Sequence, residues 1–335
     1  MRNFLLTTLV LILLTACGDK KSSNQRILFD SSGIVNNISV VVSNDLWNGS
    51  IGETIRNVLS TPIYGLPQDE PMFKINQIPS SVFSGFVTKN RTILKIELGK
   101  ESAFKIAKNV YAQPQKVIVV SGKTKSDVIE LLKENAEKIT NEFNNTELTE
   151  KQRLINKSLY NAKDIQESLG LNINFPTAYR IAKTTATKED KFFWIKKDFK
   201  ASSNVSGDLN VLLYQVPLNT INRDSTLVSQ IIKIRDSIGK RFVEGAVEGS
   251  YMATEDAYTP FNSETILDNK PALETKGLWD LKGGTFMAGP FVNYAIEDKI
   301  NNRWIIAEGF VFAPSVEKRA YMFELEAIIK SIKIN

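Results

Sequence analysis

The sequence contains no histidine and a single cysteine, Cys17, among its 335 residues. One cysteine rules out a framework of disulfides within the chain. The lack of histidine removes the commonest general base and the commonest metal ligand, and so excludes a Ser-His-Asp triad, a Cys-His dyad and an H-E-x-x-H zinc site. The charge excess is small, 42 lysines and arginines against 37 aspartates and glutamates, and it does not predict nucleic-acid binding. We expect no nucleic-acid partner, no metal and no cofactor.

The N-terminus has the pattern of a lipoprotein signal. A basic start is followed by an apolar run over residues 4–14 and by two small residues before Cys17. This run is shorter than the roughly 20 apolar residues that a membrane-spanning helix needs, as expected of a cleaved signal peptide. The ending Leu14-Thr15-Ala16-Cys17 resembles the bacterial lipobox. That resemblance implies a signal peptide at 1–16 and fatty acyl chains, such as palmitate, on Cys17.

Residues 17–26 are polar, small and charged. Because they cannot bury apolar surface, we expect them to form a flexible tether between the lipid and the folded body. Gly18, not aspartate, follows the cysteine, which favours sorting to the outer membrane. We therefore predict a protein of the bacterial cell envelope, on the periplasmic or the surface face of the outer membrane, with the membrane as a partner through the anchor.

Strand and helix patterns alternate along the remaining chain. Short β-branched or alternating runs predict strands in both halves, and apolar residues at helical spacing predict helices near residues 128–143, 227–242 and 322–332. Residues 146–170 are polar, with apolar positions at helical spacing that end at Gly170. We predict an α+β protein with two lobes of mainly antiparallel sheet and packed helices, 27–145 and 171–335, joined by a long helical connector at 146–170.

Two short motifs resemble catalytic signatures. Gly122-Lys123-Thr124 lies where a phosphate-binding loop would place it, but that loop needs a glycine at the position of Val117. Ser315-Val316-Glu317-Lys318 matches the S-x-x-K pattern of penicillin-binding proteins, yet the chain ends before their further motifs would follow. Both motifs are better explained as helix starts, with Thr124 and Ser315 as N-caps.

Carboxylates are the remaining source of acid–base chemistry. Adjacent acidic residues occur at Asp69-Glu70 and at Glu255-Asp256, but neighbours in a strand point to opposite faces and cannot form a facing pair by themselves. A hydrolase would need carboxylates from distant segments to meet, with at least one pKa strongly raised. The candidates for this chemistry are Asp69, Glu70, Glu255, Asp256, Asp280 and Glu308.

Three stretches combine glycine or proline with aromatic or apolar residues: 65–71, 249–255 and 277–292. Such stretches either form tight turns whose large side chains fill a core or line a binding pocket on a rigid loop. Both interpretations stay open. The candidate residues for a functional surface or a structural motif are Trp47, Pro67, Gln68, Asp69, Glu70, Tyr251, Met252, Trp279, Phe291 and Glu308.

These stretches also carry a family resemblance. Eight motifs appear in this order along the chain: Asp45-Leu46-Trp47-Asn48-Gly49, the run 65–71, Phe192-Phe193-Trp194, Arg235-Asp236-Ser237-Ile238, Gly249-Ser250-Tyr251-Met252, Gly277-Leu278-Trp279, Gly289-Pro290-Phe291-Val292 and Glu308-Gly309-Phe310-Val311. Together they resemble domain-of-unknown-function family 4837, lipoproteins of Gram-negative envelopes, over nearly all of the mature chain. Lys276 stands where that family usually has arginine. The resemblance implies an exported, lipidated protein and supplies no activity.

The function we expect from the sequence is that of a lipid-anchored envelope protein, a non-catalytic binding or assembly component whose partner is an envelope protein or a glycan. The alternative is a histidine-independent envelope hydrolase that uses aspartate and glutamate for acid–base chemistry.

Overall fold

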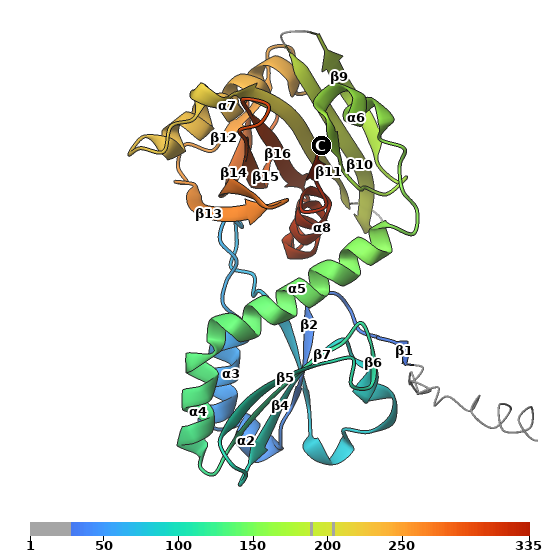
Figure 1. Cartoon of the computed structure of the whole chain (residues 1–335). Coiled ribbons are helices and arrows are strands. Elements are labelled where there is room, and N and C mark those ends of the chain that lie inside the picture. Colours follow the sequence, from blue (N-terminus) through green and yellow to red (C-terminus); the bar gives the residue numbers. More distant parts are fainter. Residues whose placement is uncertain (1–27, 188–189, 203–204) are drawn as a thin grey trace, which may run out of the picture.

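The computed structural model describes residues 28–335 except 188–189 and 203–204. It confirms the α+β class, with two sheet-containing lobes stacked one above the other (Figure 1). No strand pairing joins the five-stranded sheet of the N-terminal lobe to the eight-stranded sheet of the C-terminal lobe among the described residues. The expected signal peptide, the expected lipidation site at Cys17 and the expected tether lie outside the described residues.

The N-terminal sheet has the strand order β3 (Lys74–Ile78), β2 (Asn37–Val41), β4 (Thr92–Leu98), β7 (Lys116–Gly122) and β5 (Ala103–Lys108). The first four strands are parallel, and only β5 is antiparallel to its neighbour. The mainly antiparallel pairing that the sequence predicts is confirmed for the sheets taken together, but this lobe departs from it, because most of its strands pair in parallel. Parallel strands are covered on both faces, which accounts for the continuous β-branched runs in β2 and β7.

Helices cover one face of this sheet and irregular segments cover the other. α3 (Ser50–Leu59), α4 (Lys125–Glu134) and α5 (Ala136–Ile155) pack on the first face, with the short α2 (Asn44–Trp47) before α3. The 3₁₀ turns η1 (Ser80–Val82) and η2 (Gly85–Lys89) and the paired β1 (Phe29–Asp30) and β6 (Ala112–Gln113) lie toward the second. The expected cap of α4 is confirmed, because Asp127 N–H donates to Thr124 Oγ1 over 3.2 Å.

The helix between the lobes differs from the expected connector. α5 begins at Ala136, earlier than the predicted start at 146, and ends at Ile155, and a separate α6 (Lys163–Leu169) follows. Leu159 and Ala162, two of the apolar positions at helical spacing, lie between these helices. Leu159 does not continue a helix, because it pairs with Pro176 in an isolated bridge. Only the predicted end is as expected, since Gly170 adopts φ 62°, a left-handed conformation that suits glycine at a helix end.

The C-terminal sheet is antiparallel throughout. Its order is β12 (Tyr251–Thr254), β14 (Lys270–Lys282), β15 (Ala288–Asp298), β16 (Arg303–Phe312), β11 (Val205–Pro217), β10 (Lys191–Ser202) and β9 (Arg180–Ala186), with β13 (Phe261–Leu267) also pairing with β14. The pair β8 (Leu171–Asn172) and β17 (Lys333–Ile334) forms a small separate ladder, and η3 (Leu218–Thr220) follows β11.

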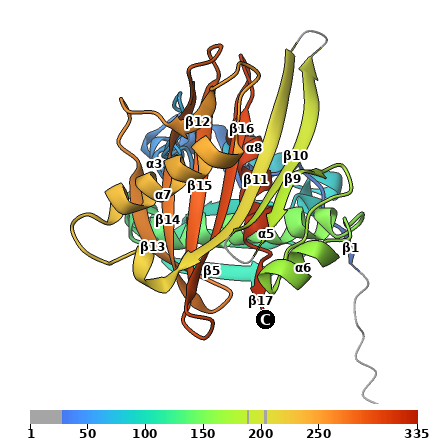
Figure 2. The same ribbon diagram turned by 90° about the horizontal axis from the view of Figure 1, so that it is seen from above.

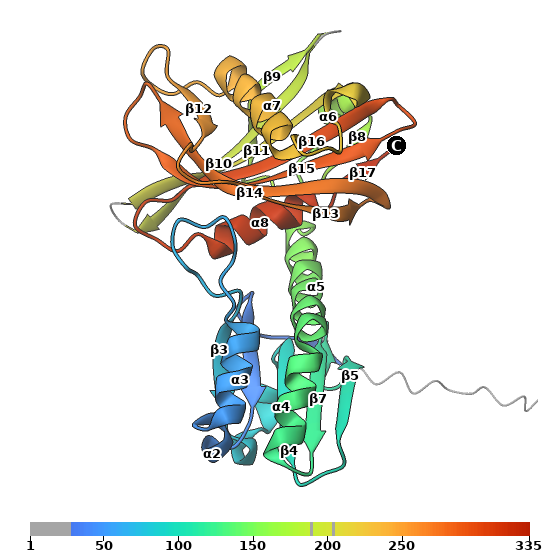
Figure 3. The same ribbon diagram turned by 90° about the vertical axis from the view of Figure 1, so that its left-hand side faces the viewer.

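Helices pack on both faces of this sheet, and α6 lies on the same side as α8, with Ile165 and Leu169 buried in the cluster that includes β10. α7 (Leu227–Phe242) crosses the strands on the outer face (Figure 2), and α8 (Arg319–Ile329) lies between the sheet and the N-terminal lobe (Figure 3). The apolar stripes predicted for both helices are core faces, with Ile231 and Phe242 buried under α7 and Leu325 and Ile329 buried under α8. No helix in the described ranges is long and apolar enough to cross a membrane.

Candidate functional site

The 65–71 loop of the N-terminal lobe contacts the C-terminal lobe. Glu70 is buried, and its two carboxylate oxygens accept hydrogen bonds from the backbone N–H groups of Lys318 and Arg319, over 2.7 and 2.9 Å, at the start of α8. The Arg319 side chain in turn donates to Pro71 O over 2.8 Å. A carboxylate at this position satisfies free backbone donors and complements the helix dipole.

This arrangement corrects the expected cap of α8. Ser315 lies three residues before the N-cap position, in a left-handed conformation with φ 61°. Its side chain therefore does not cap the helix, and the cap comes from Glu70, 248 positions away from Lys318. Local sequence favoured serine because serine is a common N-cap, and a partner so distant in sequence leaves no local signal.

A groove of about 490 Å³ opens beside this contact. Its lining combines Pro67 and Gln68 of the loop, Glu255 after β12, parts of β14 and β15, Phe286 of the connecting hairpin, residues 312–315 and Lys318. We call it the junction groove. It collects parts of all three unusual stretches, including the predicted residues Pro67, Gln68 and Trp279. A mostly apolar pocket of this size with a few polar groups is typical of a ligand site.

Glycine permits the close packing of the groove floor. A Cβ on Gly289 would lie 2.0 Å from Val311 O and 3.0 Å from Trp279 Nε1. Without it, the Trp279 indole N–H donates to Val311 O over 3.1 Å and the ring packs edge-on against Phe310. The Gly-Leu-Trp and Gly-Pro-Phe-Val stretches therefore fulfil a structural role as well as lining the groove.

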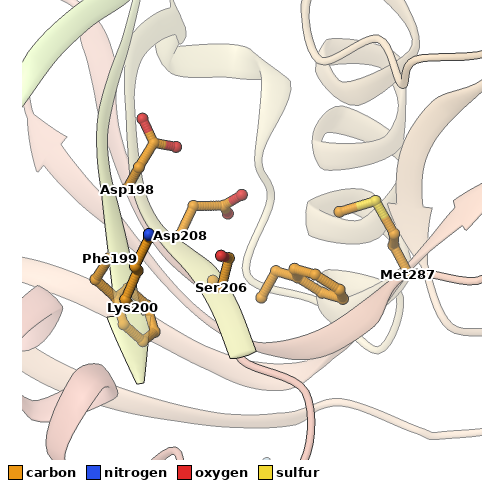
Figure 4. Close-up of a pocket in the computed structure, with 8 residues that line it drawn as sticks. Asp198, Phe199, Lys200, Ser206, Asp208 and Met287 are labelled. Carbon is orange, nitrogen blue, oxygen red and sulfur yellow. The ribbon is translucent and has the colours of Figure 1, made fainter. Parts of the chain in front are cut away.

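A second hollow, of about 470 Å³, adjoins the junction groove, and Phe312 lines both. Figure 4 shows Asp198 and Lys200 on β10, Ser206 and Asp208 on β11, and Met287 on the opposite side. Lys196 Nζ lies 3.0 Å from Asp208 and 3.6 Å from Asp198, so these carboxylates are paired with a cation. Sequence reasoning missed these residues because ordinary alternating strands carry them.

A second group of predicted residues surrounds Arg235 of α7 rather than the groove. Its Nη2 lies 2.9 Å from Glu308 Oε1, its Nη1 donates to Thr254 over 2.9 Å, and its guanidinium carbon lies 3.9 Å from the Phe291 ring centroid. Asn293 donates to the other Glu308 oxygen over 3.0 Å. Burial raises the pKa of Glu308, and the Arg235 charge opposes that rise.

This buried network joins α7 to the sheet. Arg235 and Glu308 are almost completely inaccessible, with 1% and 0% of their side-chain surface exposed. The predicted residue Met252 belongs to the same cluster, because its sulfur lies 3.6 Å from Arg235 Nη2. A raised pKa of an acidic side chain can mark a catalytic group. Here the Glu308 carboxylate is inaccessible to solvent and paired with Arg235, an arrangement typical of a buried ion pair within a folded core.

The six carboxylates considered for hydrolysis lie in different surroundings. Glu70 contacts α8, Glu308 pairs with Arg235, Asp69 is exposed, and Glu255 lines the groove while accepting from Ala257 N–H over 3.0 Å. Asp256 and Asp280 do converge, because their carboxylates lie 3.0 and 2.9 Å from Lys282 Nζ. Both are paired with that lysine, whose pKa they raise, and neither lines the groove.

The last two predicted residues lie elsewhere. Trp47 ends α2, where the Arg56 guanidinium carbon lies 4.8 Å from its ring centroid. Tyr251 begins β12, with Lys240 Nζ 5.6 Å from its ring centroid. The predicted residues therefore form no single site: they divide among the groove, the α8 contact, the Arg235 network and these separate positions. Sequence reasoning also missed Phe286, the most exposed large apolar residue of the groove, at 93%.

Lys276, the position usually occupied by arginine in the resembled family, lies on β14 facing α8. Its Nζ is 3.4 Å from Glu274 and 3.3 Å from Glu326. Burial alone would lower the pKa of Lys276, but these two carboxylates more than compensate and raise it. Lysine therefore keeps its charge here as a structural partner of α8. No cluster of three potential metal ligands occurs among the described residues.

Comparison with known proteins gives two family matches, both without an assigned function. Residues 31–156 match the model described as Domain of unknown function (DUF8532). Residues 158–331 match Domain of unknown function (DUF4837). The resemblance expected from the sequence is thus confirmed for the C-terminal half, whereas the N-terminal half, including the 65–71 loop, matches a different model. The two matched ranges meet just after the end of α5.

No curated protein matches the chain in sequence. Among solved structures, the chain is similar to LpqN, described as involved in cell envelope biogenesis of Mycobacterium tuberculosis, with 12% identity and a TM-score of 0.28 over 49% of this chain and 83% of that one. Because the DUF4837 model covers more than half of the 335 residues, this chain belongs to the DUF4837 family.

Proposed function

We propose that this protein is a lipid-anchored component of the bacterial envelope that binds an apolar segment of a partner in the junction groove, without catalysing a reaction. The observation that carries the proposal is the groove itself. Segments far apart in the chain, from both lobes, meet there around a largely apolar surface. Large exposed apolar side chains that line a groove are typical of interaction sites.

The anchor rests on the sequence. Cys17 is the only cysteine and follows the lipobox-like Leu14-Thr15-Ala16. One acyl chain gives marginal membrane binding, whereas several chains give stable attachment. We expect Cys17→Ser to abolish lipid labelling and to leave an unprocessed or soluble protein. Mature Cys17→Ser protein that still sediments with membranes would contradict the anchor.

Phe286 is the residue best placed to contact a partner. It exposes 93% of its surface at the hairpin that forms one wall of the groove. The polar groups around it are few, namely Gln68, Glu255, Ser315 and Lys318. The Lys318 ammonium already donates to Val316 O over 2.8 Å. Contact with apolar groups is therefore the main interaction that the groove offers.

The distribution of carboxylates favours binding over the hydrolase alternative. Among the acidic candidates only Glu255 lines the groove. General acid–base hydrolysis by carboxylates needs two of them facing one substrate, at about 5–9.5 Å in glycosidases. The proposal therefore assigns the groove to recognition.

In-cell photocrosslinking tests this function. A benzophenone amino acid is introduced at Phe286 and, in a matched control, at Ile300, which is 89% exposed at the other end of β15. We expect a discrete covalent adduct from position 286 and none from position 300, with loss of the adduct when Pro67 and Gln68 are replaced by bulky residues. Absence of an adduct at 286, or equal adducts at both positions, would overturn the proposal.

A further inference from the structure

Large apolar side chains lie exposed on one face of the N-terminal lobe. Phe29, Val82 and Phe86 expose 68%, 57% and 71% of their surface. They belong to β1, η1 and η2, on the side of the sheet opposite α3 and α4 (Figure 1). Neighbours in the same segments, Phe83 and Val87, pack into the core beneath. The exposed side chains therefore project from segments that their neighbours fix to the core.

Two of these segments, β1 and η2, are joined through residues at or just after their ends. Ser32 N–H donates to Lys89 O over 2.9 Å, and Arg91 N–H donates to Ser32 O over 2.9 Å. The Lys89 ammonium lies 3.8 Å from the centroid of the Phe29 ring. The start of the folded body is therefore held against η2, and η1 directly precedes η2 in the chain. We call the side of the lobe that carries Phe29, Val82 and Phe86 the tether face.

The tether face is also where the folded body meets the segment that leads to the lipid anchor. Phe29 follows Cys17 by twelve positions, and a chain of that length spans at most about 40 Å when fully extended. The intervening sequence contains Lys20, Lys21 and Arg26 against a single acid, Asp19. Basic residues next to a membrane anchor are attracted to anionic headgroups.

We propose that the tether face lies on the anionic lipid surface, with Phe29, Val82 and Phe86 in the headgroup region. Aromatic side chains are favoured at that depth, and Lys89 supplies a cation beside the Phe29 ring. This inference rests on the anchor at Cys17 given under the proposed function. It goes beyond that function because it specifies how the body is oriented: the N-terminal lobe faces the lipid, and the C-terminal lobe is held away from it.

Spin labelling tests this orientation. Because acylation blocks the only native cysteine, one introduced cysteine takes one nitroxide label. Phe86→Cys and Val82→Cys report on the tether face, and Ile300→Cys in the C-terminal lobe is the exposed control. The lipidated protein is reconstituted into vesicles of phosphatidylethanolamine and phosphatidylglycerol. Power saturation then compares collisions of each label with oxygen, which partitions into lipid, and with a water-soluble nickel chelate.

We expect the oxygen-to-nickel collision ratio at positions 82 and 86 to exceed that at 300 several-fold. The difference should shrink when phosphatidylglycerol is omitted. If mass spectrometry shows acyl chains on Cys17 but labels at 82 and 86 stay as water-accessible as at 300, the orientation is wrong and the anchor stands. If the labels at 82 and 86 are protected from both oxygen and the nickel chelate, and only in native membranes, a protein partner covers this face and the inference is overturned. Absence of acyl chains would overturn the anchor and the orientation together.

Discussion

Arg319 and Glu70 lie 249 positions apart in the chain and hydrogen-bond across the boundary between the lobes, with Arg319 N–H donating to Glu70 Oε2 over 2.9 Å. This contact places the 65–71 loop against the start of α8 and forms one wall of the junction groove. The groove is consequently a product of both lobes.

Glu70→Ala should weaken this contact. The substitution leaves two backbone donors at the start of α8 without their carboxylate, and loss of a helix cap costs about 1–2 kcal/mol. We expect a lower free energy of unfolding in urea and faster proteolysis within residues 61–73. Asp69→Ala, next to it but exposed, should stay within about 0.5 kcal/mol of the unmodified protein. Equal effects of both variants would contradict the assigned role of Glu70.

The Arg235–Glu308 pair should show strong coupling. Removing one partner of a buried pair leaves an uncompensated charge and costs about 3–5 kcal/mol. Arg235→Met should therefore destabilise the protein by that amount, whereas Arg235→Met combined with Glu308→Leu should be less harmful than Arg235→Met alone. Urea denaturation of the four proteins in the cycle measures this coupling. Asp256→Ala, which breaks an exposed pair with Lys282, is the control and should cost less than about 1 kcal/mol.

Stability should fall in acid partly through Glu324. Burial acts to raise the pKa of this carboxyl, but Lys151 and Lys197 outweigh burial and lower it to about 2 from 4.5. A depressed acid pKa stabilises the fold above the unfolded-state value and loses that contribution as the pH falls from about 4.5 to about 2. The contribution is roughly 3 kcal/mol. Glu324→Gln should flatten the stability curve across this window.

The matched variant for that experiment is Glu317→Gln. Glu317 pairs with Lys74 while 61% of its side chain is exposed, so solvent screens the interaction. We expect its acid denaturation curve to follow that of the unmodified protein. If Glu317→Gln and Glu324→Gln alter the curve equally, the acid sensitivity does not come from the buried cluster.

Gly289→Ala should disturb the groove floor. The added Cβ would stand 2.0 Å from a backbone carbonyl of β16, so the strands must shift, and such overpacking costs about 1–3 kcal/mol. We expect a lower melting temperature and a red shift in the fluorescence of the buried Trp279. Gly49→Ala, whose new Cβ would meet nothing closer than 3.4 Å, should cost less than about 1 kcal/mol. An unchanged melting temperature for Gly289→Ala would show that the floor tolerates a side chain.

Local patterns in the sequence were sufficient for several elements. The apolar spacing of residues 227–242 and 322–332 predicted α7 and α8, and the Thr124 cap lies where predicted. These signals are local because helix periodicity and capping involve residues only a few positions apart. The α+β class and the DUF4837 resemblance follow from such patterns in combination.

Tertiary structure alone decided the direction of the N-terminal strands, the break between α5 and α6, and the cap of α8. Strand direction depends on which distant segments pair and on the connections between them, because parallel neighbours such as β2 and β3 need a crossover, here through α3. Residues 144–145, beside the predicted boundary between the lobe at 27–145 and the connector at 146–170, lie inside α5. We therefore expect proteolytic cleavage between the lobes at residues 156–162, between α5 and α6.

The residues alone therefore establish the local chemistry: no histidine, one cysteine at a lipobox-like site, and stretches of glycine, proline and aromatic residues that suit either turns or pockets. Long-range folding assigned each of these stretches its role. Glu70 contacts α8, Glu308 pairs with Arg235, and Pro67 and Trp279 meet at the groove. The physical reason is that a buried charge or a groove wall requires a partner, and in this protein those partners lie tens to hundreds of positions away.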